Sequence, residues 1–223
     1  MLRKAALRGY NLCSAIARST SGVTLVEFAV AMPVILSMSL YGIELAYLNT
    51  VDMKLSEIAL SLADNASRLG QTDNSAVTPT VTRNDIAEIM MGAQEQGDPI
   101  DLGTKGRVIL SSLERDATTG KQYIHWQRCY GSLARQSAYG NDSTRNGLNG
   151  AVITGMGSGA TKVTATSTSG AVMFVEVYYS YTGLLGDLFV SNRVLRKEGA
   201  FLVRDERNLT PGITGTTGPT YTC

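Results

Sequence analysis

Residues Val23 to Leu48 read VTLVEFAVAMPVILSMSLYGIELAYL, and this apolar stretch decides the fold. It holds no Lys or Arg and only two acids, Glu27 and Glu44. As a helix it would reach about 39 Å, against roughly 30 Å of bilayer hydrocarbon. It is also longer than the apolar core of a cleaved secretory signal, and no small-x-small site clearly closes it. The stretch therefore predicts a transmembrane helix.

Charges on either side of the stretch predict its orientation. Residues 1–22 contain four basic residues and no acid, whereas Asp52, Lys54, Glu57 and Asp64 follow the stretch. Because positively charged flanks stay in the cytoplasm, we expect the N-terminus inside and the rest of the chain exported.

Composition narrows the function further. The 223 residues carry a formal net charge of +1, which gives no indication of a nucleic-acid binder. There is one His, which excludes a metal site built from several His ligands. No phosphate-binding glycine loop, G-x-S-x-G, C-x-x-C or H-E-x-x-H motif is present. We therefore expect a non-enzymatic protein without catalytic residues, cofactor or metal.

Glu27 is the most informative residue, because a carboxylate inside a hydrocarbon segment costs a few kcal/mol. One interpretation is that Glu27 lies near the interface and reaches water. The other uses its neighbours: Gly22 lies five residues before Glu27, and Phe28 follows it. This pattern resembles the prepilin signal of type IV pilins, which a membrane-embedded peptidase cuts after the Gly.

The resemblance narrows to the TadE-like family, the minor pseudopilins of the tight-adherence (Tad/Flp) pilus system. The residues that carry it are Glu27-Phe28-Ala29, Pro33, Gly42, Glu44 and the downstream element Trp126-Gln127-Arg128-Cys129-Tyr130-Gly131. It implies cleavage after Gly22 by a prepilin peptidase, which makes Val23 the new N-terminus. Pairing of Glu27 with the new ammonium group of a neighbouring subunit would then turn two costly charges into one contact.

The resemblance also implies partners and a location. The partners would be other pilins or pseudopilins, the Tad assembly platform and membrane lipid. The chain would cross the bacterial inner membrane once, with its head in the periplasm or, within a pilus, outside the cell. It would initiate, cap or anchor a Flp-type filament for surface attachment. The alternative is a signal-anchored envelope binding module with an uncleaved N-terminus.

The helix pattern continues beyond the membrane segment. Leucines recur every seven residues, at Leu48, Leu55, Leu62 and Leu69, which predicts an amphipathic stalk helix with Gly70 as its C-cap. A short coiled coil between subunits is the alternative. Pro33 removes a backbone donor from the Ala29 carbonyl and should bend the helix, unless it is simply a tolerated membrane proline.

The head is predicted to be α+β and pilin-like, with the long N-terminal helix packed on a mainly antiparallel sheet. A helix is expected from Thr82, its cap, to Met91, with Asp85 completing the cap, and residues 92–106 are expected to be turns. Expected strands are Arg107–Leu113, Gln122–Tyr130, Ala151–Thr154, Lys162–Ala165, Ala171–Tyr181, Asn192–Arg196 and Ala200–Arg204. The predicted organisation is a leader (1–22), a membrane and stalk helix (23–70) and a head (71–223), with the tail from Leu209 as extended coil.

Three cysteines bear on the compartment. Cys13 lies in the leader, whereas Cys129 and Cys223 would meet in an oxidising compartment, where a disulfide is favoured over two free thiols.

Few other residues suggest chemistry. His125 is predicted to be a surface or half-buried strand residue, because the spacing supplies no partner for it. Asp142 has too few acids around it for a Ca²⁺ loop. Tyr178, Tyr179 and Tyr181 are expected to pack in the sheet rather than to form a binding face.

Overall fold

The computed structural model describes residues 22–69, 78–186, 188–190, 193–204 and 207–223. The chain divides into two compact units, Met1–Ala46 and Tyr47–Cys223. Helix α2 runs from Val23 to Ser67, and its sequence therefore belongs to both. The predicted leader up to residue 21, Cys13 and the predicted cap Gly70 lie outside the described residues.

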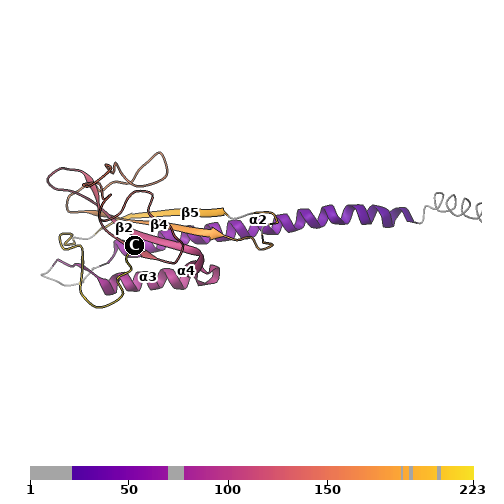
Figure 1. The fold of residues 1–223 in the computed structure, drawn as a ribbon, viewed down its shortest axis with the longest axis horizontal. Helices are drawn as coiled ribbons and strands as arrows, with labels where there is room; N and C mark the ends of the chain where they lie inside the picture. The colour runs from indigo at the N-terminus through magenta and orange to yellow at the C-terminus, as the bar shows by residue number, and fades with distance from the viewer. Residues whose placement is uncertain (1–21, 70–77, 187, 191–192, 205–206) are drawn as a thin grey trace, which may run out of the picture. The chain divides into compact units, whose positions relative to one another are not determined.

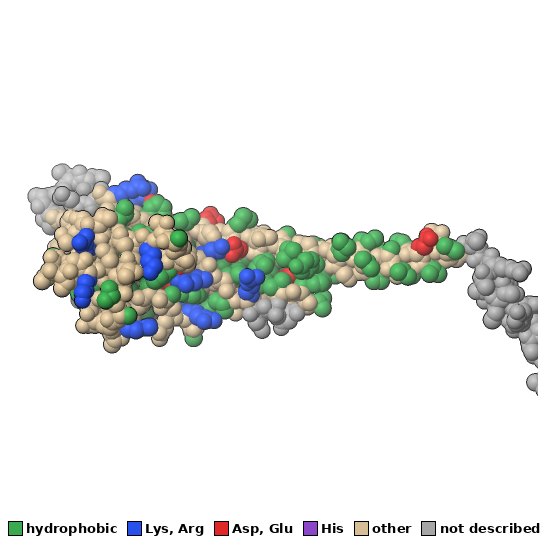
Figure 2. Space-filling view, turned by 90° about the horizontal axis from the view of Figure 1, so that it is seen from above, with side chains coloured by type: hydrophobic (Ala, Val, Ile, Leu, Met, Phe, Trp, Pro, Cys, Tyr) green, Lys and Arg blue, Asp and Glu red, His purple; other side chains and the backbone are tan. Residues whose placement is uncertain are grey.

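In the first unit, the described part of the chain is the apolar half of α2. Every residue from 22 to 43 is exposed, including large side chains such as Leu25, Phe28 and Met38. Figure 2 shows hydrophobic side chains along this segment and no Lys or Arg. A helix that is apolar all round and unburied needs a nonpolar environment.

The second unit is built on a four-stranded antiparallel sheet. Its strands are β2 (Gly106–Arg115), β3 (Gln122–Tyr130), β4 (Ala171–Tyr181) and β5 (Arg193–Leu202), in the order β3-β2-β4-β5 (Figure 1). The α+β class is confirmed, and β3 and β4 have the predicted bounds.

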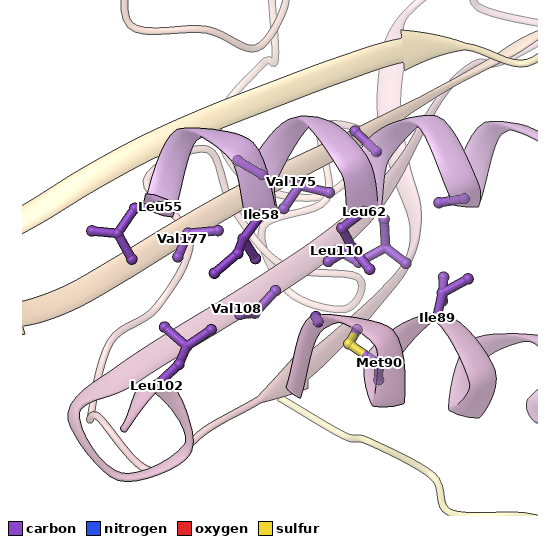
Figure 3. Close-up of a cluster of buried hydrophobic side chains, with 14 of the residues drawn as sticks. Leu55, Ile58, Leu62, Ile89, Met90, Leu102, Val108, Leu110, Val175 and Val177 are labelled. Carbon is purple, nitrogen blue, oxygen red and sulfur yellow. The ribbon is translucent and has the colours of Figure 1, made fainter. Parts of the chain in front are cut away.

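The main core lies between this sheet and two helices. The predicted leucine stripe of α2 supplies Leu55 and Leu62, and Val175 and Val177 of β4 meet it from the sheet (Figure 3). Helix α3 (Arg83–Gly97) completes this layer with Ile86, Ile89 and Met90. Because the stripe is buried on the chain's own sheet, it is not available for the alternative coiled coil.

Gly199 permits a close approach between β5 and α2. A Cβ at this position would lie 2.6 Å from the Ala59 carbonyl carbon and closer still to its oxygen. Ala59 has no exposed surface. Helix backbone therefore rests directly on strand backbone here, which only a glycine allows.

Strand β4 separates two cores by alternation. Its residues Met173, Val175, Val177, Tyr179 and Tyr181 belong to the main core, and these two tyrosines and Tyr178 are buried, in agreement with their predicted packing in the sheet. Val172 and Phe174 point to the other face, where they pack with Ile153, Met156 and Ala165 of the β3–β4 connection.

The prediction of two short strands in that connection is wrong. Ala151–Thr154 and Lys162–Ala165 contribute only isolated bridges, Gln122↔Ile153 and Met156↔Val163. The intervening Gly155 and Gly157 have φ values of 141° and 129°, which interrupt an extended ladder.

Helix α3 corrects a second expectation. It begins as predicted, with a capping box in which Thr82 Oγ1 accepts from the Asp85 amide (3.2 Å) and Asp85 Oδ2 accepts from the Thr82 amide (2.8 Å). It does not stop at Met91 but runs to Gly97, because Ala93 and Gly97 are buried beyond Gly92. A 3₁₀ turn η2 (Asp98–Ile100) and the short helix α4 (Leu102–Lys105) follow, where turns were expected.

The C-terminal part of the chain differs from two further expectations. The two strands expected around β5 form one continuous strand, Arg193–Leu202, while the predicted start at Asn192 lies outside the described residues. The tail is not wholly extended coil, because β6 (Ile213–Thr214) pairs in parallel with β1 (Val81–Thr82).

Candidate functional site

The predicted membrane segment coincides with the start of α2. Among the described residues, α2 is the one helix long and apolar enough to cross a membrane, with a mean hydropathy of 2.0 in its most apolar window. None of that window is buried within the chain. This finding supports a single-pass membrane protein, and the orientation stays a prediction.

The predicted processing site lies at the first turn of this helix. Gly22 is exposed, α2 begins at Val23, and no heavy atom lies within 4 Å of a Cβ built on Gly22. Val23 is half exposed. The peptide bond between them is therefore open to an approaching enzyme.

Glu27 and Phe28 follow on the same exposed helix. Among the described residues, Glu27 has no hydrogen-bond or ion-pair partner. A carboxylate in lipid without a partner is costly.

Pro33 lies inside α2, which continues through it. Ser37 Oγ donates to the Pro33 carbonyl at 2.6 Å. A serine bonded back to the residue four positions earlier often accompanies a helix bend. The bend itself stays a prediction.

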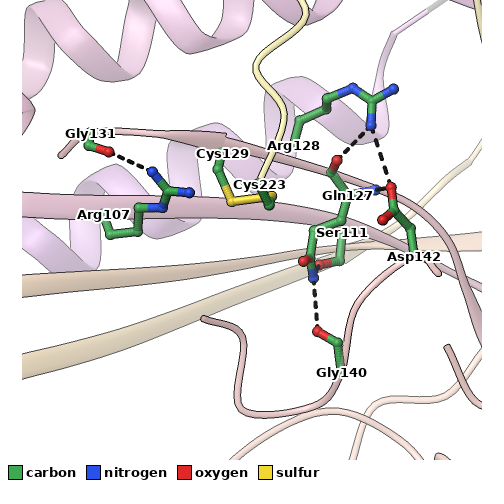
Figure 4. The surroundings of a disulfide bond; sticks show 9 residues. All are labelled: Arg107, Ser111, Gln127, Arg128, Cys129, Gly131, Gly140, Asp142 and Cys223. Atoms are coloured by element: carbon green, nitrogen blue, oxygen red, sulfur yellow. Dashed lines mark hydrogen bonds and ion pairs between the residues drawn. A yellow bond between two sulfur atoms is a disulfide. The ribbon is translucent and has the colours of Figure 1, made fainter. Parts of the chain in front are cut away.

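The predicted disulfide joins Cys129 of β3 to Cys223 of the tail (Figure 4). The two Cα atoms are 4.9 Å apart, and the bond links positions 94 residues apart in sequence. Beside it, the Cys129 amide donates to the Tyr221 carbonyl at 2.7 Å. The end of the tail is therefore fixed to the sheet by one covalent bond and one hydrogen bond.

Other contacts fasten the rest of the tail. Arg207 is buried, and its guanidinium donates to the carbonyls of Ser67 and Leu69 at the end of α2. The Asn208 amide donates to the Pro79 carbonyl at 2.9 Å. The tail from 207 to 223 thus ties the end of the stalk helix to β1 and β3, a role that its Gly- and Thr-rich composition did not indicate.

His125 has the partner that its sequence neighbourhood lacked. A register irregularity between Ser112 and Leu113 places His125 beside Glu114, with His125 Nδ1 3.0 Å from Glu114 Oε2. The same carboxylate accepts from the hydroxyls of Tyr123 (3.1 Å) and Ser112 (2.8 Å). The hydrogen bond to Glu114 raises the pKa of His125, and burial beside Glu114 raises the pKa of Tyr123.

This cluster ties strands β2 and β3 together. The Ser112 hydroxyl is bonded to Glu114 rather than to His125, so the three groups do not form a nucleophile–base pair. The other ring nitrogen, Nε2, faces the tail, 3.3 Å from where a Cβ on Gly212 would lie. The absence of catalytic residues nevertheless stays a prediction.

A second ionic cluster lies on the outer face of the sheet. Glu176 is fully buried, and its Oε1 accepts from Arg196 (2.9 Å), the Tyr178 hydroxyl (2.8 Å) and the Ala138 amide (3.1 Å). The Arg196 guanidinium also lies 5.3 Å from the Tyr139 ring centre. These contacts hold the β3–β4 connection against the sheet.

Metal ligands do not cluster in the part of the chain that the structure describes, where no group of three or more His, Cys, Asp or Glu could hold an ion. Asp142 is 3.5 Å from Arg128 and accepts from the Gln127 amide at 3.0 Å. Its carboxylate is therefore engaged by the protein itself.

Comparison with known proteins gave no relative: no family model, no curated protein and no solved structure matches the chain.

Proposed function

We propose that this chain is a TadE-like minor pseudopilin, a non-enzymatic subunit that helps to initiate, cap or anchor a Flp-type tight-adherence pilus. It would be inserted in the bacterial inner membrane through the first half of α2, with the N-terminus in the cytoplasm and the head in the periplasm. A prepilin peptidase would cut it after Gly22.

One observation carries the proposal. Gly22 is exposed directly before an unburied apolar helix, and Glu27 lies just over one turn into that helix without a partner among the described residues. A peptidase substrate needs the first feature. A subunit that pairs its carboxylate with the ammonium group of a neighbour explains the second, because a charge in lipid is stable only when paired.

The two halves of helix α2 also differ in their surroundings. Residues 22–43 are exposed and mostly apolar, whereas Leu55, Ile58 and Leu62 are buried on the sheet. A single helix that anchors with one half and carries a folded head on the other is what a pilin-like subunit requires.

Processing is tested by replacing Gly22 with Leu in the full chain and measuring the N-terminus of the protein from native membranes. The matched control is Gly42→Leu, since Gly42 is also exposed on α2 with no atom within 4 Å of a built Cβ. We expect Gly22→Leu to remain uncut and Gly42→Leu to start at Val23. An uncut wild-type protein would contradict the proposal.

The role of Glu27 is tested separately. Glu27→Gln should reduce incorporation into the pilus assembly, because the amide cannot pair with an ammonium group as a charge. Glu57→Gln is the control, since Glu57 is exposed and pairs with Lys54 on the helix surface (3.0 Å). Equal incorporation of the Glu27→Gln and wild-type proteins would refute the pairing.

The alternative, a signal-anchored envelope binding module, is favoured by one observation. A polar pocket of about 280 Å³ lies beside the disulfide. This function predicts an intact Met1 in native membranes, so the same measurement of the N-terminus separates the two.

A further inference from the structure

The pocket beside the disulfide is formed by residues of β2, β3, the loop 135–145 and the tail, with Ile109 as the contribution of β2. Strand β3 contributes Arg128 and Cys129, the loop 135–145 forms a second wall, and Thr222 and Cys223 of the tail form a third. Figure 4 shows Arg128, Asp142 and Gly140 grouped near the Cys129–Cys223 bond. The disulfide therefore holds one wall of the pocket in place.

Charge in the pocket is predominantly positive. The lining contains three guanidinium groups, Arg128, Arg135 and Arg145, and one side-chain carboxylate, Asp142. Asp142 is already engaged by Arg128 (3.5 Å) and by a backbone amide. Even if Cys223 ends the chain with a free carboxylate, the cations outnumber the anions.

Two of the arginines lack an acidic partner in the described chain. Arg145 donates to the neutral Gln136 side-chain oxygen at 3.4 Å, and the Arg135 guanidinium makes no ion pair with any described residue. Elsewhere in the head, by contrast, Arg196 is paired with two carboxylates. Arg135 and Arg145 therefore remain able to bind an anion from solution.

The loop that carries these arginines is fixed before any ligand arrives. Asn141 Oδ1 accepts from the amides of Ser143 (3.1 Å) and Arg145 (2.9 Å). Gly140 has φ of 140°, and a side chain there would collide with the Arg145 carbonyl. The side-chain amide of the buried Gln127 donates from Nε2 to Ser111 Oγ (2.9 Å) and to the Gly140 carbonyl (3.4 Å), which ties the loop to the sheet.

We propose that this pocket binds one anionic group, a carboxylate, phosphate or sulfate, carried on a ligand about as large as a single sugar ring. Guanidinium groups match the two oxygens of such anions. The volume of about 280 Å³ is at the small end for ligand pockets, which excludes larger molecules from complete burial. The site is independent of cleavage after Gly22, so the two proposals can fail separately.

Calorimetric titration of the full chain in detergent, at constant ionic strength, tests the site. The probes are inorganic phosphate, glucuronate and, as the neutral match, glucose. We expect saturable binding of at least one of the two anions and no binding of glucose. The anion that binds more tightly identifies the ligand chemistry. Failure of both anions to saturate would overturn the proposal.

Variants locate the binding. Arg135→Gln and Arg145→Gln should each weaken the affinity for the anion by about tenfold, which is the usual effect of losing a hydrogen bond to a charged group. Arg193→Gln, an exposed arginine outside the pocket, is the matched control and should leave the affinity unchanged. Equal weakening by all three would show general attraction to a basic surface and would contradict the assignment.

The disulfide provides a second test. Replacing Cys129 and Cys223 together by Ser releases the tail wall and should abolish saturable binding, provided that Trp126 fluorescence shows a folded head. Trp126 is the single tryptophan and is buried in the main core. Unchanged affinity in a folded double variant would show that the tail does not form the site, and this would refute the assignment.

Discussion

Replacement of Gly199 by Ala should destabilise the head, because the stalk helix and strand β5 meet there without intervening side chains. The added Cβ would lie 2.6 Å from the Ala59 carbonyl carbon and 3.0 Å from the Leu60 amide nitrogen. Normal contacts to carbon are close to 3.5–4.0 Å, so one backbone must move by most of an ångström. Neither can move freely, since Ala59 is fully buried and Gly199 is paired with Val175 in the sheet.

Overpacking of this kind costs about 1–3 kcal/mol. For a unit of this size, that corresponds to a decrease in Tm of roughly 2–12 °C. The assay is thermal unfolding of the full chain in detergent, followed by Trp126 fluorescence. Because Trp126 belongs to the same core cluster as Ala59, its signal reports on this interface.

The same substitution elsewhere is the control. Gly92 is half-buried in α3, with no atom within 4 Å of a built Cβ. Gly92→Ala should therefore stabilise the protein by about 0.5–1 kcal/mol, through helix propensity alone. If Gly199→Ala unfolded at or above the wild-type temperature, helix α2 could not be seated on β5 as described.

Three further predictions concern the disulfide, the single histidine and the cap of α3. Removing the disulfide by replacing Cys129 and Cys223 with Ser should cost up to about 4–5 kcal/mol, seen as a lower Tm that reductant no longer changes. Glu114→Gln should lower the pKa of His125 in an NMR titration, because the hydrogen bond to Glu114 raises that pKa. Because folding raises the pKa of His125, the pair stabilises the fold below a pH of about 6.5, and this contribution is lost as the pH rises through the folded-state pKa. Thr82→Ala removes the N-cap and should cost about 1 kcal/mol in urea unfolding.

Local patterns in the sequence were sufficient for much of the fold. The strand predicted at Ala171–Tyr181 is β4, and its side chains divide between two cores because successive side chains of a strand point to opposite faces. The leucine stripe predicted that α2 continues beyond the membrane segment, and the Thr82–Asp85 spacing predicted where α3 begins.

Expectations failed where tertiary contacts override local signals. Gly92 was interpreted as the start of a turn-rich segment, yet the burial of Ala93 and Gly97 keeps α3 helical beyond it. The short strands expected around Gly155 found no continuous partner, so only single bridges formed.

The candidate sites were predictable only in part. A disulfide between Cys129 and Cys223 followed from the compartment and the number of cysteines. The pairing of His125 with Glu114 depends on a register irregularity, which has no marker in a single sequence. The arginine-lined pocket depends on the tail returning to β3, a contact between positions 94 residues apart.

The most direct test of the account is the N-terminus of the wild-type protein purified from its native membranes, measured by sequencing or intact mass. The account predicts a chain that begins at Val23 and retains Glu27 as its fifth residue. A chain that still begins at Met1 would contradict the proposed pseudopilin.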